Sequence, residues 1–228
     1  MLNVYQSNRT ERLVDALSLN LSRDPAGPFD PTVILTHSFG LGQWLRIGIA
    51  ERLGIAAGVV TSLPATWIWR LCQEEFGLDA DARRSAFDTD VMTFMLARLL
   101  AGTGAGSAAG EPLAAVTDYI GQGADRDLRA YQLAARLAHL YDQYLLYRPD
   151  WMLAWELGSE HPEGDLAWVA VLWQRLTAET TEPHRVRLYA QLAERLATRP
   201  PANAPSRVSI FGLSTLPPAQ LEVFCALA

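Results

Sequence analysis

Two spacings of apolar and polar positions alternate along the first 86 residues, one typical of strands and one of helices. Residues 2–6 alternate apolar and polar side chains, which predicts a short strand, and residues 33–36 form a continuous apolar run that suits a buried parallel strand. Residues 56–61 indicate a third strand. Helical spacing follows each of the three, and the predicted helices cover residues 13–21 and 43–53 and begin again at Pro64.

The pattern changes near Phe87, beyond which only helical spacing is found until Ala197. A Gly/Ala/Ser segment at residues 102–110 interrupts it and is expected to be a flexible surface loop. Past the proline-rich residues 199–205, residues 208–211 predict one more strand, and Pro217-Pro218 introduces a closing helix. The helices predicted in the strand-free part cover residues 90–101, 113–120, 126–147, 151–157, 166–177 and 185–198.

Alternating strands and helices, then a long helical stretch and a strand that returns to the sheet, describe an α/β domain with an all-helical subdomain inserted in it. We therefore expect the first part of the α/β domain in residues 1–86, the inserted subdomain in residues 87–200, and the return to the α/β domain in residues 201–228. The last apolar helix stops without a cap or a polar tail, so we expect this domain to be cut short at its C-terminus.

The basic residues of the chain are all arginine: nineteen positions carry Lys or Arg, and no lysine occurs among them. A P-loop nucleotidase needs a lysine ammonium on the β- and γ-phosphates, so the chain is not expected to hydrolyse ATP by that route. Its net charge of −6 argues against a self-sufficient, non-specific DNA-binding protein, which is usually basic. A local arginine groove could still contact nucleic acid.

The two cysteines, Cys72 and Cys225, each lie in an apolar helical pattern and are predicted to be small buried residues in a reducing compartment. The chain shows no signal peptide and no apolar run long enough for a membrane span. The four histidines have no metal-ligand spacing with the cysteines. We therefore expect a cytoplasmic protein with no membrane contact, no metal and no cofactor.

Three strand ends carry an informative sequence, because open α/β sheets bind ligands at the carboxyl ends of their strands. The first, Ser7-Asn8-Arg9-Thr10, stands where a phosphate-binding loop would lie and has neither glycine nor lysine. The second of them comprises Thr36 to Leu45. The last, Phe211-Gly212-Leu213, stands where the acidic residues that hold Mg²⁺ would be. Both phosphate-handling positions therefore lack the side chains that their chemistry needs.

Five stretches are distinctive and follow one another along nearly the whole chain: residues 2–9, 38–45 with 54–57, 63–69, 141–151 and 211–221. The most specific is Asp142 to Trp151, with the sequence DQYLLYRPDW. In this order the stretches resemble the N-terminal part of the RecC family, the gamma subunits of exodeoxyribonuclease V (the RecBCD helicase–nuclease). Members of that family are several times longer than this chain.

The resemblance implies a helicase-like (P-loop-type) open parallel sheet that lacks the Walker motifs, with an inserted all-α subdomain. It implies that this fragment is not an enzyme by itself but belongs to an ATP-dependent exodeoxyribonuclease and helicase complex of DNA repair and recombination. Its partners would be RecB-like and RecD-like motor and nuclease subunits and single-stranded DNA, which the family scans for the Chi hotspot. The alternative is an inactive helicase-like fold that serves only as a protein–protein interaction module.

By the same resemblance, six residues fall where the family lines its strand-scanning channel: Gln43, Leu63, Trp69, Asp142, Arg148 and Arg185. Arginine on phosphates, aromatic rings on bases and polar groups on base edges are the usual contacts to single strands. Each of the six also has a structural alternative, as a solvated, capping or packing residue, and the sequence leaves both open. Trp67 and Trp69 cannot share a helix face, and we expect Trp69 to be the exposed one.

Three positions depart from the family's best-known pattern. His37 and Phe39 stand where that pattern has polar side chains, and His139 replaces an acidic residue. The sequence therefore leaves open which DNA sequence is recognised, or whether any is.

Overall fold

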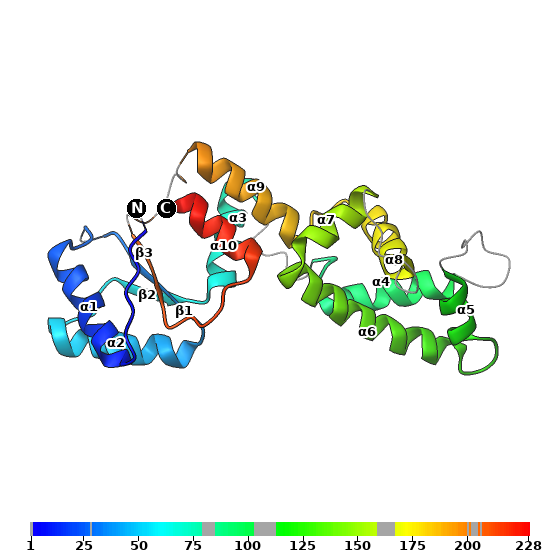
Figure 1. Ribbon diagram of the computed structural model, residues 1–228, viewed down its shortest axis with the longest axis horizontal. Coiled ribbons are helices and arrows are strands. Elements are labelled where there is room, and N and C mark those ends of the chain that lie inside the picture. Colours follow the sequence, from blue (N-terminus) through cyan, green and yellow to red (C-terminus); the bar gives the residue numbers. More distant parts are fainter. Residues whose placement is uncertain are drawn as a thin grey trace. The chain divides into compact units, whose positions relative to one another are not determined.

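The computed structural model describes residues 2–27, 29–78, 85–102, 113–158, 167–199, 201, 205 and 207–228. This part of the chain holds ten helices and three strands and is a mixed α/β protein, as predicted (Figure 1). The chain divides into two compact units. The first comprises Met1–Leu78, Gln191–Leu216 and Gln220–Ala228, and the second comprises Asp79–Ala190 and Pro217–Ala219. The predicted domain limits near residues 86 and 200 stay a prediction.

The first unit is built on a parallel three-stranded sheet in the order β2 (Val59–Ser62), β1 (Thr32–Thr36), β3 (Val208–Phe211). Helices cover the central strand β1 on both sides (Figure 1). They are α1 (Thr10–Arg23) and α2 (Phe39–Leu53) on one face and α3 (Pro64–Phe76) on the other. All residues of β1 from Val33 to Thr36 are buried. Burial on both faces explains why this strand is a continuous apolar run rather than an alternating one.

The core of the first unit joins the sheet to α1 and α2. Its buried apolar members are Val14, Ile34, Leu45, Ile49 and Phe211. Beside α3 lies α10 (Pro218–Leu227), where the ring of Phe224 stacks on that of Trp67 with centroids 6.0 Å apart. The helix that follows β3 is therefore fixed to the helix that follows β2 by an aromatic contact.

The strand predicted at residues 2–6 is wrong. These residues belong to no strand, and the side chains of Leu2, Val4 and Tyr5 are exposed. A strand forms only where a neighbouring strand offers unpaired N–H and C=O groups and a face to pack on. Within the described residues β1 has β2 on one side and β3 on the other, and neither outer edge takes up residues 2–6. Alternation over five residues could not decide this pairing.

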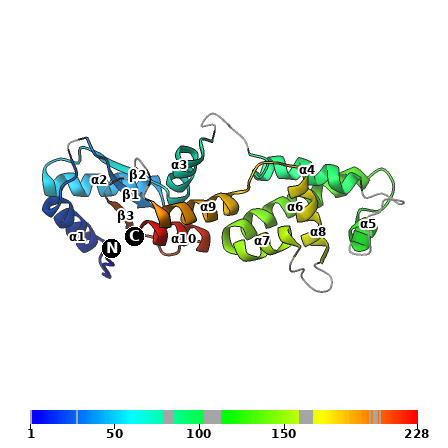
Figure 2. The ribbon, with the colours of Figure 1, turned by 90° about the horizontal axis from the view of Figure 1, so that it is seen from above.

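The described part of the second unit contains helices and no strand. Helix α6 (Arg126–Tyr147) runs alongside α4 (Thr89–Ala101), as Figure 2 shows. At the centre of the core the fully buried rings of Tyr141 and Trp173 lie 5.2 Å apart. Trp173 donates its indole N–H to the Met152 carbonyl at 3.1 Å. The other helices are α5 (Ala114–Ile120), α7 (Pro149–Leu157), α8 (Ala167–Ala178) and α9 (Arg185–Thr198), which continues into the first unit.

Most predicted helix limits agree with the structure within two residues, but helix α1 begins at Thr10, three residues before the predicted start, and the starts of helix α2 and strand β2 also differ. Helix α2 begins at Phe39, four residues before the predicted start, because the Ser38 side-chain oxygen accepts a hydrogen bond from the Leu41 N–H at 3.2 Å and caps it there. Strand β2 begins at Val59 and not at residue 56. Apart from Gly102, the loop predicted at residues 102–110 lies outside the described residues.

One cysteine is buried as predicted and the other is not. Burial raises the pKa of the Cys72 thiol to about 12. Cys225, predicted to be buried, is exposed. It stands two residues after the buried Val223 on α10, and positions two apart face opposite sides of a helix. No helix in the described part of the chain is long and apolar enough to span a membrane.

Candidate nucleic-acid interface

The carboxyl ends of β1, β2 and β3 lie at one edge of the sheet, because the three strands are parallel. Gln43 is an exposed residue of α2, which follows β1 after a two-residue turn. Leu63 is the N-terminal capping residue of α3, directly after β2, and is partly buried with an extended backbone. Gln43 and Leu63 therefore both belong to segments that leave the carboxyl edge of the sheet.

Close contacts between the connection that follows β1 and the connection that follows β3 fix this edge. The Thr36 hydroxyl donates to the Ser38 carbonyl at 3.0 Å, and His37 Nδ1 lies 3.2 Å from the Gly212 carbonyl. A carbonyl only accepts, so His37 carries its proton on Nδ1 in this contact. Gly212 has a φ of +66°, and a Cβ there would lie 2.9 Å from Leu41. The turn after β3 is therefore pressed against the start of α2.

Trp69 presents an indole ring at the surface of the first unit. The side chain is 37% exposed, whereas Trp67, two residues earlier on α3, is 8% exposed and stacks on Phe224. The prediction that Trp69 is the exposed member of the pair is confirmed. A half-exposed indole can stack on a nucleic-acid base.

In the second unit, Asp142 and Arg185 bind each other. Arg185 Nη2 donates to the Asp142 carbonyl oxygen at 2.8 Å and also to its carboxylate. The side chain of Arg185 is 32% exposed and that of Asp142 is 29% exposed. Arg185 Nε is buried and has no hydrogen-bond partner among the described residues. Two predicted site residues, which lie 43 positions apart in the sequence, are thus brought together as an ion pair.

Arg148 lies in a stack of charge and rings at the junction of α6 and α7. Its guanidinium binds both carboxylate oxygens of Asp150, at 3.0 and 2.7 Å, and lies 3.5 Å from the centroid of the Trp151 ring. The hydrogen bond from Arg148 lowers the pKa of Asp150 and raises that of Arg148 itself. Trp151 stacks on Trp155 at 5.9 Å, and Tyr144 meets both rings edge-on. The cation–π contact between Arg148 and Trp151 holds the guanidinium in place.

Sequence reasoning missed three residues that shape these sites. Asp150 and Trp151 were part of the distinctive motif but were not recognised as the partners of Arg148, although their spacing in Arg-Pro-Asp-Trp is local. His184, one residue before Arg185, is buried at the start of α9. A histidine in the position that Ser, Asp or Asn usually takes before a helix was the available signal.

Fold and site together define a mixed α/β protein whose two units present tryptophan and arginine at their surfaces. The chain belongs to the RecC family: the family described as RecC, N-terminal domain, matches residues 2–228. Among similar proteins, the RecBCD enzyme subunit RecC of Escherichia coli (strain K12) is 36% identical over 237 residues, and that of Haemophilus influenzae is 32% identical over 256 residues. The RecC subunit of Mycolicibacterium smegmatis is 29% identical over 238 residues.

These alignments cover 100% of this chain but 20%, 22% and 20% of the three relatives. The chain therefore spans about a fifth of the length of these relatives.

Proposed function

We propose that the chain is a non-catalytic DNA-handling and scaffold segment of a recombination and repair helicase–nuclease, exodeoxyribonuclease V. The match over residues 2–228 to a family whose named members are RecBCD enzyme subunits carries the proposal. In this function the segment acts in the cytoplasm. It contacts single-stranded DNA and scans the strand for a recombination hotspot. RecB-like and RecD-like partner subunits supply the motor and nuclease activities.

The open parallel sheet supports a helicase-like origin for the first unit. A working nucleotidase of that class would need a phosphate-binding lysine, and the chain contains no lysine. Its β3 continues into Phe211-Gly212-Leu213 rather than into acidic residues. We therefore assign ATP hydrolysis to the partner subunits.

The physical state of the two arginines supports contact with a DNA strand. Arg148 and Arg185 are held by carboxylates in pairs that are 29% to 62% exposed. The pair of Arg148 with Asp150 is exposed, and exposed ion pairs are typically worth about 0–1 kcal/mol, so a phosphate can replace Asp150 at small cost. The pair of Arg185 with Asp142 is only partly exposed. Trp69 adds an exposed ring for base stacking, while Gln43 and Leu63 complete the proposed contacts at the sheet edge.

The experiment is a fluorescence anisotropy titration of labelled single-stranded DNA with the 228-residue chain, at low and at moderate salt. We expect saturable binding that weakens as salt rises, because each phosphate contact to a single strand contributes about −0.7 to the slope of log K against log salt. Absence of binding at low salt would refute strand contact by this segment.

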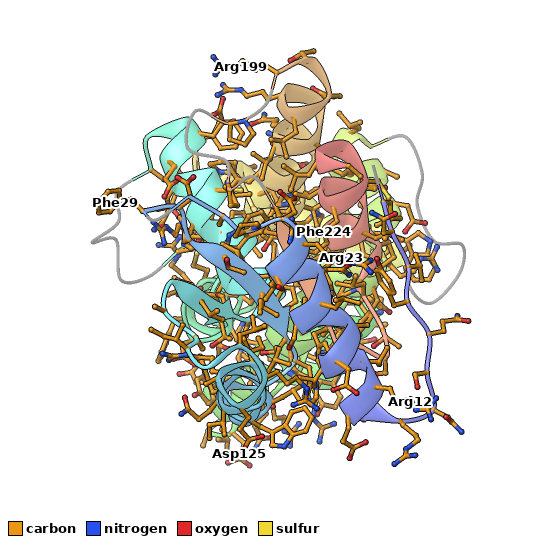
Figure 3. All side chains as sticks on the ribbon, turned by 90° about the vertical axis from the view of Figure 1, so that its left-hand side faces the viewer. Arg12, Arg23, Phe29, Asp125, Arg199 and Phe224 are labelled. Carbon is orange, nitrogen blue, oxygen red and sulfur yellow. The ribbon has the colours of Figure 1, made fainter. Side chains whose placement is uncertain are left out.

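Charge reversal separates the proposal from its rival. Arg148→Glu and Arg185→Glu should each weaken strand binding while the chain still assembles with its RecB-like partner. Arg12→Glu is the matched control, since Arg12 projects from the first turn of α1 in the first unit (Figure 3) and is no predicted contact residue. Unchanged strand binding in both reversals, with assembly intact, would favour an inactive helicase-like fold that serves only as a protein–protein interaction module.

A further inference from the structure

His184 is the most completely buried histidine among those the structure describes, and it precedes the first residue of α9. Its side chain is 1% exposed. The imidazole packs against the rings of Phe87 and Trp173, with centroids 5.5 Å away in each case, and these two rings also contact each other at 5.7 Å. A buried polar ring is costly unless its nitrogens are hydrogen-bonded.

Both imidazole nitrogens have partners, and these partners define the tautomer. The backbone N–H of Arg187 donates to Nδ1 at 3.3 Å, so Nδ1 carries a lone pair. Nε2 therefore carries the proton and donates to Glu156 Oε2 at 3.1 Å. Burial lowers the pKa of His184, although the bond to Glu156 opposes this. The ring is consequently neutral, with one nitrogen as donor and the other as acceptor.

The bond to Nδ1 is a helix N-cap. The His184 carbonyl accepts the first hydrogen bond of α9, from the Leu188 N–H at 3.2 Å. Its ring at the same time accepts from the N–H of the third helical residue, Arg187, as a capping Ser, Asp or Asn does. A cap satisfies a backbone donor that would otherwise lack a partner in the first turn.

The capped first turn carries the arginine of the proposed strand contact. Arg185 reaches from it to Asp142 on α6. On the same turn Arg187 binds Glu156 Oε1 at 2.9 Å, so one carboxylate of α7 holds both His184 and Arg187. Two contacts thus fix the direction in which Arg185 leaves the helix. One is the His184 cap, and the other is the Glu156 carboxylate, which His184 and Arg187 share.

We propose that His184 is a positioning residue that holds Arg185 at Asp142 by capping α9, and so prepares the single-strand contact. This inference rests on the proposed function. His184 itself is too deeply buried to touch a strand. The cap fixes the backbone of the first turn of α9, and this turn fixes the position of the Arg185 guanidinium.

Two amide substitutions separate the two bonds of the ring. In His184→Asn the amide oxygen stands near the position of Nδ1 and can keep the cap. In His184→Gln the amide stands near the position of Nε2, which keeps the contact with Glu156 and loses the cap. Both variants lose the ring that packs against Phe87 and Trp173, so each is the matched control for the cavity of the other.

The direct measurement is the Nε–Hε signal of Arg185 and its exchange with water by NMR, in the 228-residue chain without DNA. We expect slow exchange in the wild type and in His184→Asn, and fast exchange in His184→Gln. Slow exchange in a folded His184→Gln would overturn the inference. If His184→Gln does not fold, fast exchange in the folded His184→Asn variant would overturn it instead.

Strand binding then tests the link to function. His184→Gln should bind single-stranded DNA about 3- to 10-fold more weakly than His184→Asn, within the usual worth of a helix cap. In an Arg185→Gln background this difference should vanish, whereas a general loss of stability would persist there. If the NMR result stands and Arg185→Gln binds DNA as the wild type does, the strand contact by Arg185 is refuted and the positioning role is retained.

Discussion

Replacing Gly42 with alanine tests how closely α2 approaches the sheet. A Cβ at this position would lie 2.9 Å from Thr61 Oγ1 and 3.0 Å from Thr61 Cβ. Thr61 is on β2 and pairs with Ile34 of the central strand. Its Cβ is bonded to the backbone and cannot swing aside, whatever rotamer the hydroxyl takes. Overpacking of this kind costs about 1–3 kcal/mol. Alanine instead of glycine in a helix gains about 1 kcal/mol, so Gly42→Ala should lower the free energy of unfolding by about 0–2 kcal/mol.

Gly40→Ala is the matched control on the same helix. A Cβ at Gly40 meets nothing within 4 Å, so this variant should gain up to about 1 kcal/mol from helix propensity alone. The two variants should then differ by the overpacking cost, about 1–3 kcal/mol. In a chain of this size the difference corresponds to roughly 2–12 °C in Tm.

The assay is thermal unfolding followed by circular dichroism, with the two variants compared under identical conditions. Gly42→Ala should melt below Gly40→Ala. Equal shifts in the same direction would refute the close approach, because they would mean that Thr61 gives way without cost. A normal melt of Gly42→Ala with impaired strand binding would place the strain in the part of α2 that carries Gln43.

Three further outcomes are expected. Trp69→Ala should weaken single-strand binding by about 1–3 kcal/mol while Trp69→Phe keeps most of it; equal affinity of wild type and alanine variant would remove Trp69 from the interface. Trp173→Phe leaves the Met152 carbonyl without its 3.1 Å donor and should lower the free energy of unfolding by about 1–3 kcal/mol, a result that unchanged urea unfolding would contradict. The pKa of Asp150, followed by NMR, should lie below the ordinary 3.8 because of its hydrogen bond from Arg148. The stabilisation by this pair is then present above pH 3.8 and is lost as the pH falls through the lower folded-state pKa. Asp150→Asn should abolish this pH dependence of stability. A measured pKa of 3.8 or more for Asp150 would argue against the pair in solution.

Helices were well predicted where the apolar spacing was long and unbroken. The limits of α6 (Arg126–Tyr147) and α9 (Arg185–Thr198) follow from the sequence, since many turns of consistent spacing specify one helix. The start of α2 did not follow, because it depends on whether Ser38 turns its hydroxyl to the Leu41 N–H. A cap is a local contact, but a sequence offers several residues that could form one.

The candidate site was predicted in part. That only one of Trp67 and Trp69 is buried follows from helix geometry, and the structure shows that it is Trp67. The pairing of Asp142 with Arg185 does not, because it joins residues 43 positions apart on different helices. The same holds for the carboxylate of Glu156, which His184 and Arg187 share.

The sequence by itself determined the mixed α/β class, the helix periods, the lack of a phosphate-binding lysine and the family. Those properties depend on local spacing and residue type. Only the tertiary structure decided that residues 2–6 form no strand, that Cys225 is exposed, and that Arg185 is held by Asp142. Strand pairing, burial and ion pairs form between segments distant in sequence, so their outcome depends on the packing that the whole chain adopts.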